Sequence, residues 1–406
     1  MLEAAHSVFL SSSRVGQLLQ RGDVARFVFD EDYWQDGQRP VLGLWFEDNP
    51  RNSPQAALRL PTWFSNLLPE GPLRQWIAHD RGVSADRELQ LLLRIGHDLP
   101  GAVTVVEGGD AVVDPELFKA PSTLGTAASE SVWKFSLAGV GLKFSLLRRG
   151  DRLTLPASEN LGNWIVKFPD AIYRDVPANE FATMSIASAV GINVPEIEYV
   201  HRDSLPDLPD VMWPGTEEFA YAIKRFDRSE SGDRIHIEDM NQVRGFYPDA
   251  KYSGTFETVL GLSHRGHDIE SLREAVRRLT FNLLVGNGDA HLKNWSFIYP
   301  DGRRPKLSPA YDLVSTAGYS APGHPEDFGL KFGGSKRLER IGRDAFTRIE
   351  STLGVERGDV RDVVDSTVER FLKAWADGHD ESFPDSARLW ITENLQSTTT
   401  RLLRKD

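Results

Sequence analysis

A chain of 406 residues exceeds what one simple hydrophobic core usually organises, because domains typically hold about 100 to 200 residues, so we expect two or three domains. The absence of cysteine excludes disulfides, thiolate zinc sites and cysteine nucleophiles. The formal net charge of −12 argues against a broad surface that follows nucleic-acid phosphates, since such surfaces depend on Lys and Arg.

The first 108 residues are predicted to form a small α+β module. Its strand-like runs are short, as at residues 25–29, and one helical stretch at residues 87–95 ends at Gly96. The segment 107–131 is small and polar, which predicts a linker or long loop. The opening residues lack the charged start and long apolar stretch of a secretory signal, so a cytoplasmic location is expected.

Residues 109–228 are predicted to form a β-rich part. One helix interrupts its strands, because Pro177 suits a first helical turn, apolar residues follow at helical spacing, and Gly191 supplies a stop. The strand-like runs cover residues 132–136, 142–147, 164–168 and 219–223.

Residues 229–406 are predicted to be mainly helical. No internal repeat of 20 to 50 residues is visible in the sequence. A strand-rich layer thus precedes a helix-rich layer along the chain, which indicates an α+β fold. Apolar residues recur at helical spacing in residues 269–285, 343–353, 360–375 and 386–403.

The segment GNGDAHLKNWS at residues 286–296 concentrates polar side chains directly after an apolar run. Phosphoryl transfer needs a carboxylate that orients the attacking hydroxyl, an amide oxygen and a second carboxylate for Mg²⁺, and a lysine on the phosphates. Asp289 and Asn294 have the D-x4-N spacing of a kinase catalytic loop. Asp312 follows a predicted hairpin that returns the chain beside its start, so Asp312 and Asn294 are candidates to hold one hard cation.

Two features upstream of this loop suit the same chemistry. Lys167 ends a strand-like run, and the helix that follows carries Glu180, the arrangement expected of a phosphate-binding lysine held by a glutamate. The turn at residues 138–143 joins two strand-like runs through small residues, which lets backbone N–H groups approach phosphates.

Each feature has an ordinary structural alternative. The glycine-containing turn is more often a simple tight turn, Lys167 and Glu180 could form a surface ion pair of little energetic value, and Asp312 could cap a turn. Asp289 and His291 could bind the metal of a hydrolytic centre, although no His-rich cluster accompanies them. These alternatives do not explain the order of the features along the chain.

Nine segments carry a more specific signal. They are FSNLLPEG at 64–71, IGHDLPGAV at 95–103, SLAGVGLKFS at 136–145, WIVKFP at 164–169, NEFATMSIASAVGINVP at 179–195, KRFDR at 224–228, EDMNQ at 238–242, GDAHLKNWS at 288–296 and SPAYDLVST at 308–316. With these segments the sequence closely resembles the HipA family of bacterial serine/threonine-protein kinases, the toxins of toxin–antitoxin pairs, over nearly its whole length.

The resemblance implies a bilobal protein-kinase-like fold, with residues 109–228 as a nucleotide-binding N-lobe and residues 229–406 as a catalytic C-lobe. It implies that Asp289 is the catalytic base and that Asn294 and Asp312 bind Mg²⁺. Ser136 falls where such kinases carry an inhibitory autophosphorylated serine. The residues implied to contact ATP are Ala138, Gly139, Val140, Gly141, Leu142, Lys143, Lys167, Lys224, Arg225, Phe226, His291, Leu292, Lys293, Asn294, Tyr311 and Asp312.

Two departures from relatives concern these sites. Lys224 stands where some relatives have Glu before Arg-Phe-Asp-Arg, which leaves backbone contacts to adenine open. Residues 312–314 read Asp-Leu-Val and not the Asp-Phe-Gly of eukaryotic protein kinases, so regulation through that element is not implied.

The resemblance also implies partners. Family members phosphorylate aminoacyl-tRNA synthetases and arrest translation, so growth inhibition is the implied outcome. Their usual partner is a small helix-turn-helix antitoxin, HipB-like, that binds DNA, and an acidic chain is compatible with a basic partner. DNA would then be bound only through the antitoxin.

Two rival functions stay open. A small-molecule or lipid kinase is one, because G-D-x-H-x-x-N also resembles the catalytic loops of aminoglycoside and phosphoinositide kinases. The other is a catalytically silent corepressor that uses its folded lobes only to hold an antitoxin.

Overall fold

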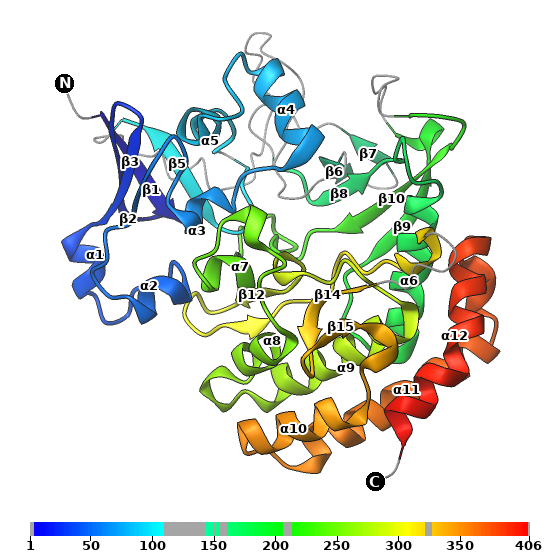
Figure 1. The fold of residues 1–406 in the computed structure, drawn as a ribbon. Coiled ribbons are helices and arrows are strands. Elements are labelled where there is room, and N and C mark those ends of the chain that lie inside the picture. Colours follow the sequence, from blue (N-terminus) through cyan, green and yellow to red (C-terminus); the bar gives the residue numbers. More distant parts are fainter. Residues whose placement is uncertain are drawn as a thin grey trace.

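The computed structural model describes residues 4–96, 98–108, 143–149, 152–154, 161–205, 213–320 and 327–404. A sheet with short helices forms one end of the molecule, a second sheet lies beside it, and long helices make up the other end (Figure 1). The predicted α+β class is confirmed. The predicted strand at residues 132–136, which includes Ser136, lies outside the described residues, as do residues 138–142 of the predicted turn at 138–143.

The first sheet has the strand order β4-β3-β2-β1-β5, and all neighbouring strands are antiparallel. Its strands are β1 (Ala4–Leu10), β2 (Ser13–Arg21), β3 (Val24–Phe29), β4 (Gln55–Ala57) and β5 (Val103–Glu107). Alternate residues of a strand point to opposite faces, and the ring of Phe27 packs on one face against Phe46 and Phe64, with centroids 5.5 Å and 4.9 Å away.

The N-terminal module also contains short helices. They are α1 (Glu31–Gln35), α2 (Leu44–Asp48), α3 (Thr62–Ser65), α4 (Gly71–Asp80) and α5 (Glu88–Ile95). The prediction of a single helix in this module was therefore wrong, although α5 itself matches the predicted stretch. One-turn helices such as α2 and α3 are too short to show a helical period, and burial of Phe46, Trp63 and Phe64 stabilises them instead.

The second sheet has the strand order β7-β6-β8-β10-β9. Its strands are β6 (Lys143–Arg149), β7 (Arg152–Thr154), β8 (Trp164–Lys167), β9 (Ile197–His201) and β10 (Phe219–Lys224). Along β10, Ala220 and Ala222 join the hydrophobic core of the N-terminal module, whereas Tyr221 and Ile223 join the core of α6 (Val176–Val190) and the C-terminal helices. This sheet is therefore packed on both faces, between the two other parts of the molecule.

The C-terminal part, which we call the helical part, holds the long helices and two small sheets, β11-β12-β13 and β14-β15. Its helices are α7 (Met240–Val243), α8 (Phe256–Ser263), α9 (Ile269–Val285), α10 (Arg343–Leu353), α11 (Arg361–Ala376) and α12 (Asp385–Leu403). Its strands are β11 (His236–Asp239), β12 (Ser296–Tyr299), β13 (Lys306–Leu307), β14 (Asp327–Phe332) and β15 (Ser335–Arg337). The four long predicted helices are confirmed as α9 to α12, within one residue at each end.

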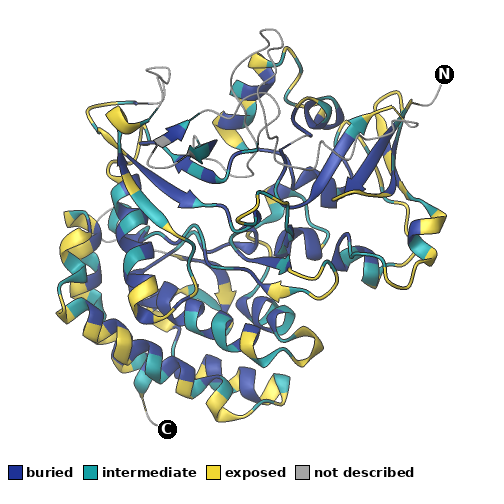
Figure 2. Ribbon diagram, turned by 180° about the vertical axis from the view of Figure 1, so that it is seen from behind, coloured by how far each residue is buried: buried dark blue, intermediate teal, exposed yellow. Residues whose placement is uncertain are grey.

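Burial follows these layers. Figure 2 shows buried residues along the strands and along α9, and exposed residues on the outer sides of α10, α11 and α12. Asp268 caps the start of α9 by accepting a hydrogen bond from the backbone N–H of Ser271. In the described part of the chain, no helix combines the length and apolar character needed to cross a membrane. The domain boundaries at residues 108 and 228 stay predictions.

Candidate active site

The loop at residues 286–296 begins where α9 ends. Gly286 ends the helix with φ of 67°, and a Cβ atom there would lie 2.4 Å from an aromatic carbon of α12, so glycine alone suits this exit. The carbonyl oxygen of Asp289 accepts hydrogen bonds from the side-chain amide of Asn294 at 2.9 Å and from the backbone N–H of His291 at 2.8 Å. These bonds fold the loop into a tight turn that brings Asp289 and Asn294 together.

Lys167 connects the second sheet with the helical part. Its Nζ lies 2.6 Å from Oε1 of Glu180 in α6, and it also forms an ion pair with Asp312. The backbone of Asp312 has φ of 59°, which residues other than glycine adopt rarely and which recurs at functional sites. Lys167 and Asp312 are 145 positions apart, so tertiary folding alone brings them together.

A cavity of about 320 Å³ lies between the second sheet and the helical part, and many residues predicted for the site line it. They are Lys143, Lys167, Glu180, Lys224, Arg225, Phe226, Asp289, His291, Lys293, Asn294, Tyr311 and Asp312. The predicted residues Ala138, Gly139, Val140, Gly141 and Leu142 lie outside the described part of the chain. The proposed phosphate lysine, metal ligands and acid therefore share one cavity.

Leu292 does not line this cavity. Its side chain is fully buried in the core of the helical part, and a Cβ atom on Gly254 would lie 2.9 Å from it. The packing of the loop against the core therefore rules out a contact between the Leu292 side chain and a nucleotide. Any contact at this position would involve the backbone.

The side chain of Arg225 belongs to a buried ionic network, which we call the Asp98 cluster. The cluster consists of Asp98, Arg225, Asp227 and Arg228. Arg225 Nη1 lies 3.0 Å from the Asp98 carboxylate, and its Nη2 lies 2.8 Å from that of Asp227. Since the guanidinium of Arg225 already has these partners, only its backbone remains to meet a ligand.

Two aromatic rings form another part of the wall. The rings of Phe226 and Tyr311 lie 5.5 Å apart between centroids, at an angle of 34°. The Tyr311 hydroxyl is hydrogen-bonded to Ser296 Oγ at 2.5 Å and donates to the carbonyl oxygen of Lys293 at 2.9 Å. These rings offer a flat, partly apolar surface of the kind that contacts a planar base.

Comparisons with known proteins show the family of this chain. A model described as the HipA N-terminal domain matches residues 6–106, and a model described as the HipA-like C-terminal domain matches residues 135–375. The chain belongs to the HipA family. The putative kinase Y4dM of Sinorhizobium fredii is 41% identical to this chain over 396 residues, which cover 93% of this chain and 92% of that protein.

A second relative and a solved structure extend the comparison. The serine/threonine-protein kinase toxin HipA of Shewanella oneidensis is 30% identical over 326 residues, which cover 70% of this chain and 69% of that protein. A chain from the solved Shewanella oneidensis complex of HipA, HipB and operator DNA matches with a TM-score of 0.74 and 22% identity, covering 98% of this chain and 97% of its own. The bilobal HipA fold implied by the sequence is thereby confirmed.

The ionisable side chains that line the cleft shift one another's pKa values. Burial alone would raise the pKa of Asp312, but the positive charges of Lys167 and Lys143 outweigh it and lower the pKa. Burial and the neighbouring charge of Lys167 lower the pKa of Lys143 to about 8. Burial raises the pKa of Glu180 against the opposing charge of Lys167. Asp312 is consequently ionised at neutral pH and has the charge that a hard cation requires.

Asp289 has a partner that the sequence did not reveal. The hydroxyl of Tyr252 donates a hydrogen bond to Oδ1 of Asp289, and the Tyr252 ring meets the His291 ring edge-on, with centroids 5.1 Å apart. Burial raises the pKa of Asp289, and the hydrogen bond from Tyr252 opposes this rise. Burial lowers the pKa of His291 to about 3, so its imidazole is neutral at pH 7. Asp289 therefore already holds a protein hydroxyl in this structure.

The donor set in the cleft fits a magnesium ion bound together with a nucleotide. Asn294 and Asp312 supply one amide oxygen and one carboxylate, and Mg²⁺ is usually held by one or two such groups with phosphate oxygens and waters. Among the described residues, no group of three His, Asp or Glu side chains is arranged to hold a metal ion. The residues that are present therefore suit a nucleotide-bound Mg²⁺.

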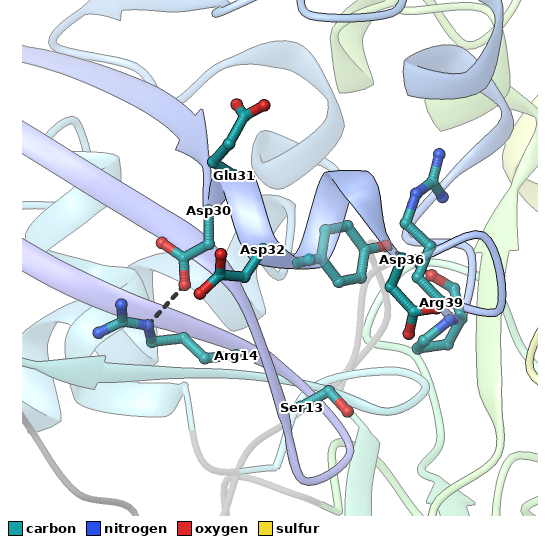
Figure 3. A pocket seen from close by; sticks show the side chains of 9 residues that line it. Ser13, Arg14, Asp30, Glu31, Asp32, Asp36 and Arg39 are labelled. Carbon is teal, nitrogen blue, oxygen red and sulfur yellow. Dashed lines mark hydrogen bonds and ion pairs between the residues drawn. The ribbon is translucent and has the colours of Figure 1, made fainter.

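A second hollow, of about 480 Å³, lies on the N-terminal module and holds none of the predicted site residues. Figure 3 shows Asp30, Glu31 and Asp32 at the start of α1 and Asp36 and Arg39 at its other end. Arg14 Nε lies 2.6 Å from Asp30, the contact drawn as a dashed line. Four of its lining residues are acids, and none of the predicted catalytic or ATP-contacting residues is among them, so the cleft between the lobes is the candidate active site.

The N-terminal module also contributes to the cleft, which the site prediction missed. The contributed residues are Asn66, Leu67, Glu70 and Pro100. Three of them belong to the segment FSNLLPEG, which supported the family resemblance but was assigned no role. The sequence does carry a signal here, because Asn66 and Glu70 are polar residues in a segment that is otherwise mainly apolar. Tyr252 has no comparable signal.

Proposed function

We propose that this HipA-family protein is an ATP- and Mg²⁺-dependent serine/threonine protein kinase that acts as the toxin of a toxin–antitoxin pair. The observation that supports this most strongly is the meeting of Lys167, Asp289, Asn294 and Asp312 around one cavity, from three separate stretches of the chain. Relatives named as kinases, at 41% and 30% identity, support the same class of reaction. A cytoplasmic location is part of the proposal, because ATP and the translation machinery are found there.

In the proposed reaction, the oxygen of a serine or threonine hydroxyl attacks the γ-phosphorus of ATP, the bond from that phosphorus to the β–γ bridging oxygen breaks, and ADP leaves. Asp289 orients the hydroxyl and accepts its proton. Lys167, held by Glu180, offsets charge on the phosphates. Asn294 and Asp312 would hold Mg²⁺, which supplies further charge neutralisation when bound.

The proposed division of labour follows the two lobes. Residues 109–228 would bind the nucleotide, with the turn at residues 138–143 around the phosphates and the backbone of residues 224–226 beside the adenine. Residues 229–406 would supply the base and the metal ligands. Ser136 would be the site of an inhibitory autophosphorylation.

The proposed substrate rests on the resemblance to the HipA family, and the proposed antitoxin rests on that resemblance and on a solved structure. A translation component such as an aminoacyl-tRNA synthetase would be the substrate, and a HipB-like helix-turn-helix antitoxin would neutralise the kinase and carry it to DNA. The solved structure that matches this fold is part of a HipA, HipB and operator DNA complex, which supports an antitoxin of that type. The net charge of −12 suits a basic partner.

One experiment tests activity, substrate class and partner together. The purified chain is incubated with γ-labelled ATP, Mg²⁺ and a cell lysate, with and without the product of the neighbouring gene. We expect label in a protein band, at phosphoserine or phosphothreonine, and less label when the neighbouring product is added. Label in a lipid or small molecule instead, or nucleotide binding with no transfer at all, would refute the proposal.

A further inference from the structure

The N-terminal module reaches the loop at residues 286–296 through one acidic side chain. Glu70 lies directly before α4, and its carboxylate oxygens meet two lysines of the helical part. Its Oε1 lies 2.6 Å from Nζ of Lys293, and its Oε2 lies 3.4 Å from Nζ of Lys251. Lys293 is part of the loop itself, immediately before the proposed metal ligand Asn294.

Burial makes these contacts strong constraints. The exposed fractions of the side chains are 14% for Glu70, 5% for Lys293 and 12% for Lys251. A charge so far removed from water needs a partner of opposite sign, because the alternative is an uncompensated buried charge. The Lys293 ammonium therefore stays at Glu70, and the backbone of the loop is held with it.

A second contact from the same segment supports this arrangement. The carbonyl oxygen of Asn66 accepts a hydrogen bond from Lys293 Nζ at 3.3 Å. The side chain of Asn66 also accepts a hydrogen bond from Asn241 at 2.9 Å and donates one to the carbonyl oxygen of Phe246 at 2.8 Å. Hydrogen bonds thus connect this segment to three residues of the helical part, which fixes the position of Glu70.

The hydrogen bonds of the loop carry this constraint to the groups that would act on ATP. The carbonyl oxygen of Lys293 accepts the hydroxyl hydrogen of Tyr311, the residue before Asp312. The backbone N–H of Leu292 donates to the carbonyl oxygen of Lys251 at 3.1 Å. Both lysines that Glu70 holds are therefore bonded, through their own carbonyl groups, to the segments that carry Asn294 and Asp312.

We propose that Glu70 is a positioning residue of the phosphoryl-transfer site, through which the N-terminal module holds the 286–296 loop in its working geometry. This proposal rests on the proposed kinase function. Catalytic groups lose about 100-fold in rate when they are displaced by about 1 Å, so a loose loop slows transfer without removing any group that touches ATP. The N-terminal module is then a part of the active site.

The same two parts of the molecule share a surface ion pair that serves as a matched control. Arg59 of the N-terminal module lies 3.0 Å from Asp249 of the helical part, and the exposed fractions of these side chains are 38% and 74%. This pair spans the same interface but is solvated and does not contact the loop. Asp249→Asn should therefore leave transfer unchanged.

The test compares Glu70→Gln, Asp249→Asn and the unmodified chain as full-length proteins. Gln keeps the volume of Glu70 and removes its charge. We expect kcat for transfer from ATP to fall about 10- to 100-fold in Glu70→Gln, while KM for MgATP changes less than about 2-fold. Amide hydrogen exchange should become about 10-fold faster in residues 287–295 and stay unchanged in α9. Asp249→Asn should match the unmodified chain in every readout.

A kcat of Glu70→Gln within about 2-fold of the unmodified value would overturn the proposal. So would faster exchange in α9 as well as in the loop, because that pattern means general loss of stability. If Glu70→Gln does not fold, Glu70→Asp, which keeps the charge and shortens the reach, is held to the same criteria. If the unmodified chain transfers no phosphate, the kinase proposal fails, whereas hydrogen exchange still reports whether Glu70 holds the loop.

Discussion

Two ionic clusters border the same cleft and differ in how far they are closed to solvent. In the Asp98 cluster, the four side chains are between 0% and 7% exposed, and two arginines balance two aspartates. The cluster around Lys167 is more open, because two carboxylates share this lysine and the side chains of Lys167 and Asp312 are 20% and 38% exposed. The charge of Lys143 acts on the same carboxylates.

The difference separates a structural role from a chemical one. A closed, balanced cluster cannot accept a ligand without leaving a buried charge unpaired. Its role is therefore structural: it joins Asp98 of the N-terminal module to the segment that follows β10. A cluster that is open to solvent can exchange partners with a metal ion or with phosphate groups, because water reaches Lys167 and Asp312. Changes in the Asp98 cluster should therefore affect stability, and changes around Lys167 should affect transfer.

Loss of the closed cluster should have the greatest consequence, and that consequence is for stability. Asp98→Ala removes the carboxylate that both Arg225 and Arg228 contact, and breaking such a buried pair typically costs about 3–5 kcal/mol. We expect the free energy of unfolding in urea, measured by circular dichroism, to fall by that amount. A loss below about 1 kcal/mol would show that the cluster is not closed in solution.

The next effect is on the chemical step. Asp289→Gln and Asp312→Gln should each lower the rate of phosphoryl transfer by about 100-fold or more, so that no transfer is measurable, because each removes a charged group at the reacting phosphate. Their free energies of unfolding should stay within about 1 kcal/mol of the unmodified chain. Autophosphorylation at the unmodified rate in either purified variant would show that the site is assigned wrongly.

Part of the pH dependence of stability should come from the Asp98 cluster. Burial would raise the pKa of Asp227, but the charges of Arg225 and Arg228 lower it below the ordinary 3.8. A lowered folded-state pKa means that this stabilisation is complete above about pH 5, above the pKa in the unfolded chain, and is lost as the pH falls toward the folded-state pKa. The free energy of unfolding in urea, measured at pH 5, 4 and 3, should decline in this way for the unmodified chain. The decline should be shallower for Asp98→Asn. Equal slopes for the two proteins would contradict this origin.

A smaller change is expected in the binding of the acceptor hydroxyl at Asp289. Tyr252→Phe removes the hydroxyl that donates to Asp289, and a hydrogen bond of this kind contributes about 1 kcal/mol. A substrate hydroxyl would no longer compete with it, so KM for the protein acceptor should fall about 5-fold in steady-state assays. An increase in KM would mean that Tyr252 helps to bind the substrate instead.

Local patterns are sufficient to predict much of the helical part. Helices α9 to α12 follow from apolar residues at helical spacing over 11 to 19 residues, a length at which the period is unambiguous. The D-x4-N loop follows α9 directly, so its turn is made by neighbours in sequence. Spacing along the chain therefore makes Asp289 and Asn294 candidates, whereas their assignment to a site depended on the order of the other features and on the family resemblance.

The N-terminal module is harder to predict in this way. Helices α1 to α3 span four or five residues each, too few for a period, and they exist because their aromatic residues pack together. Arg225 was predicted to contact ATP, but its side chain is occupied by Asp227 and by Asp98, which lies 127 positions away along the chain. Leu292 lies inside the predicted catalytic loop, yet its side chain packs in the core and does not line the cleft.

The α+β class, the long helices, the polar loop after α9 and the family all follow from the order of residues, because each depends on residue types at short, regular spacings. Which charges meet depends instead on how the sheets and helices pack. The contacts of Lys167 with Asp312, of Glu70 with Lys293 and of Tyr252 with Asp289 join residues between 37 and 223 positions apart. No spacing rule relates such residues, since the distance between them is set by the packing of elements that are remote along the chain.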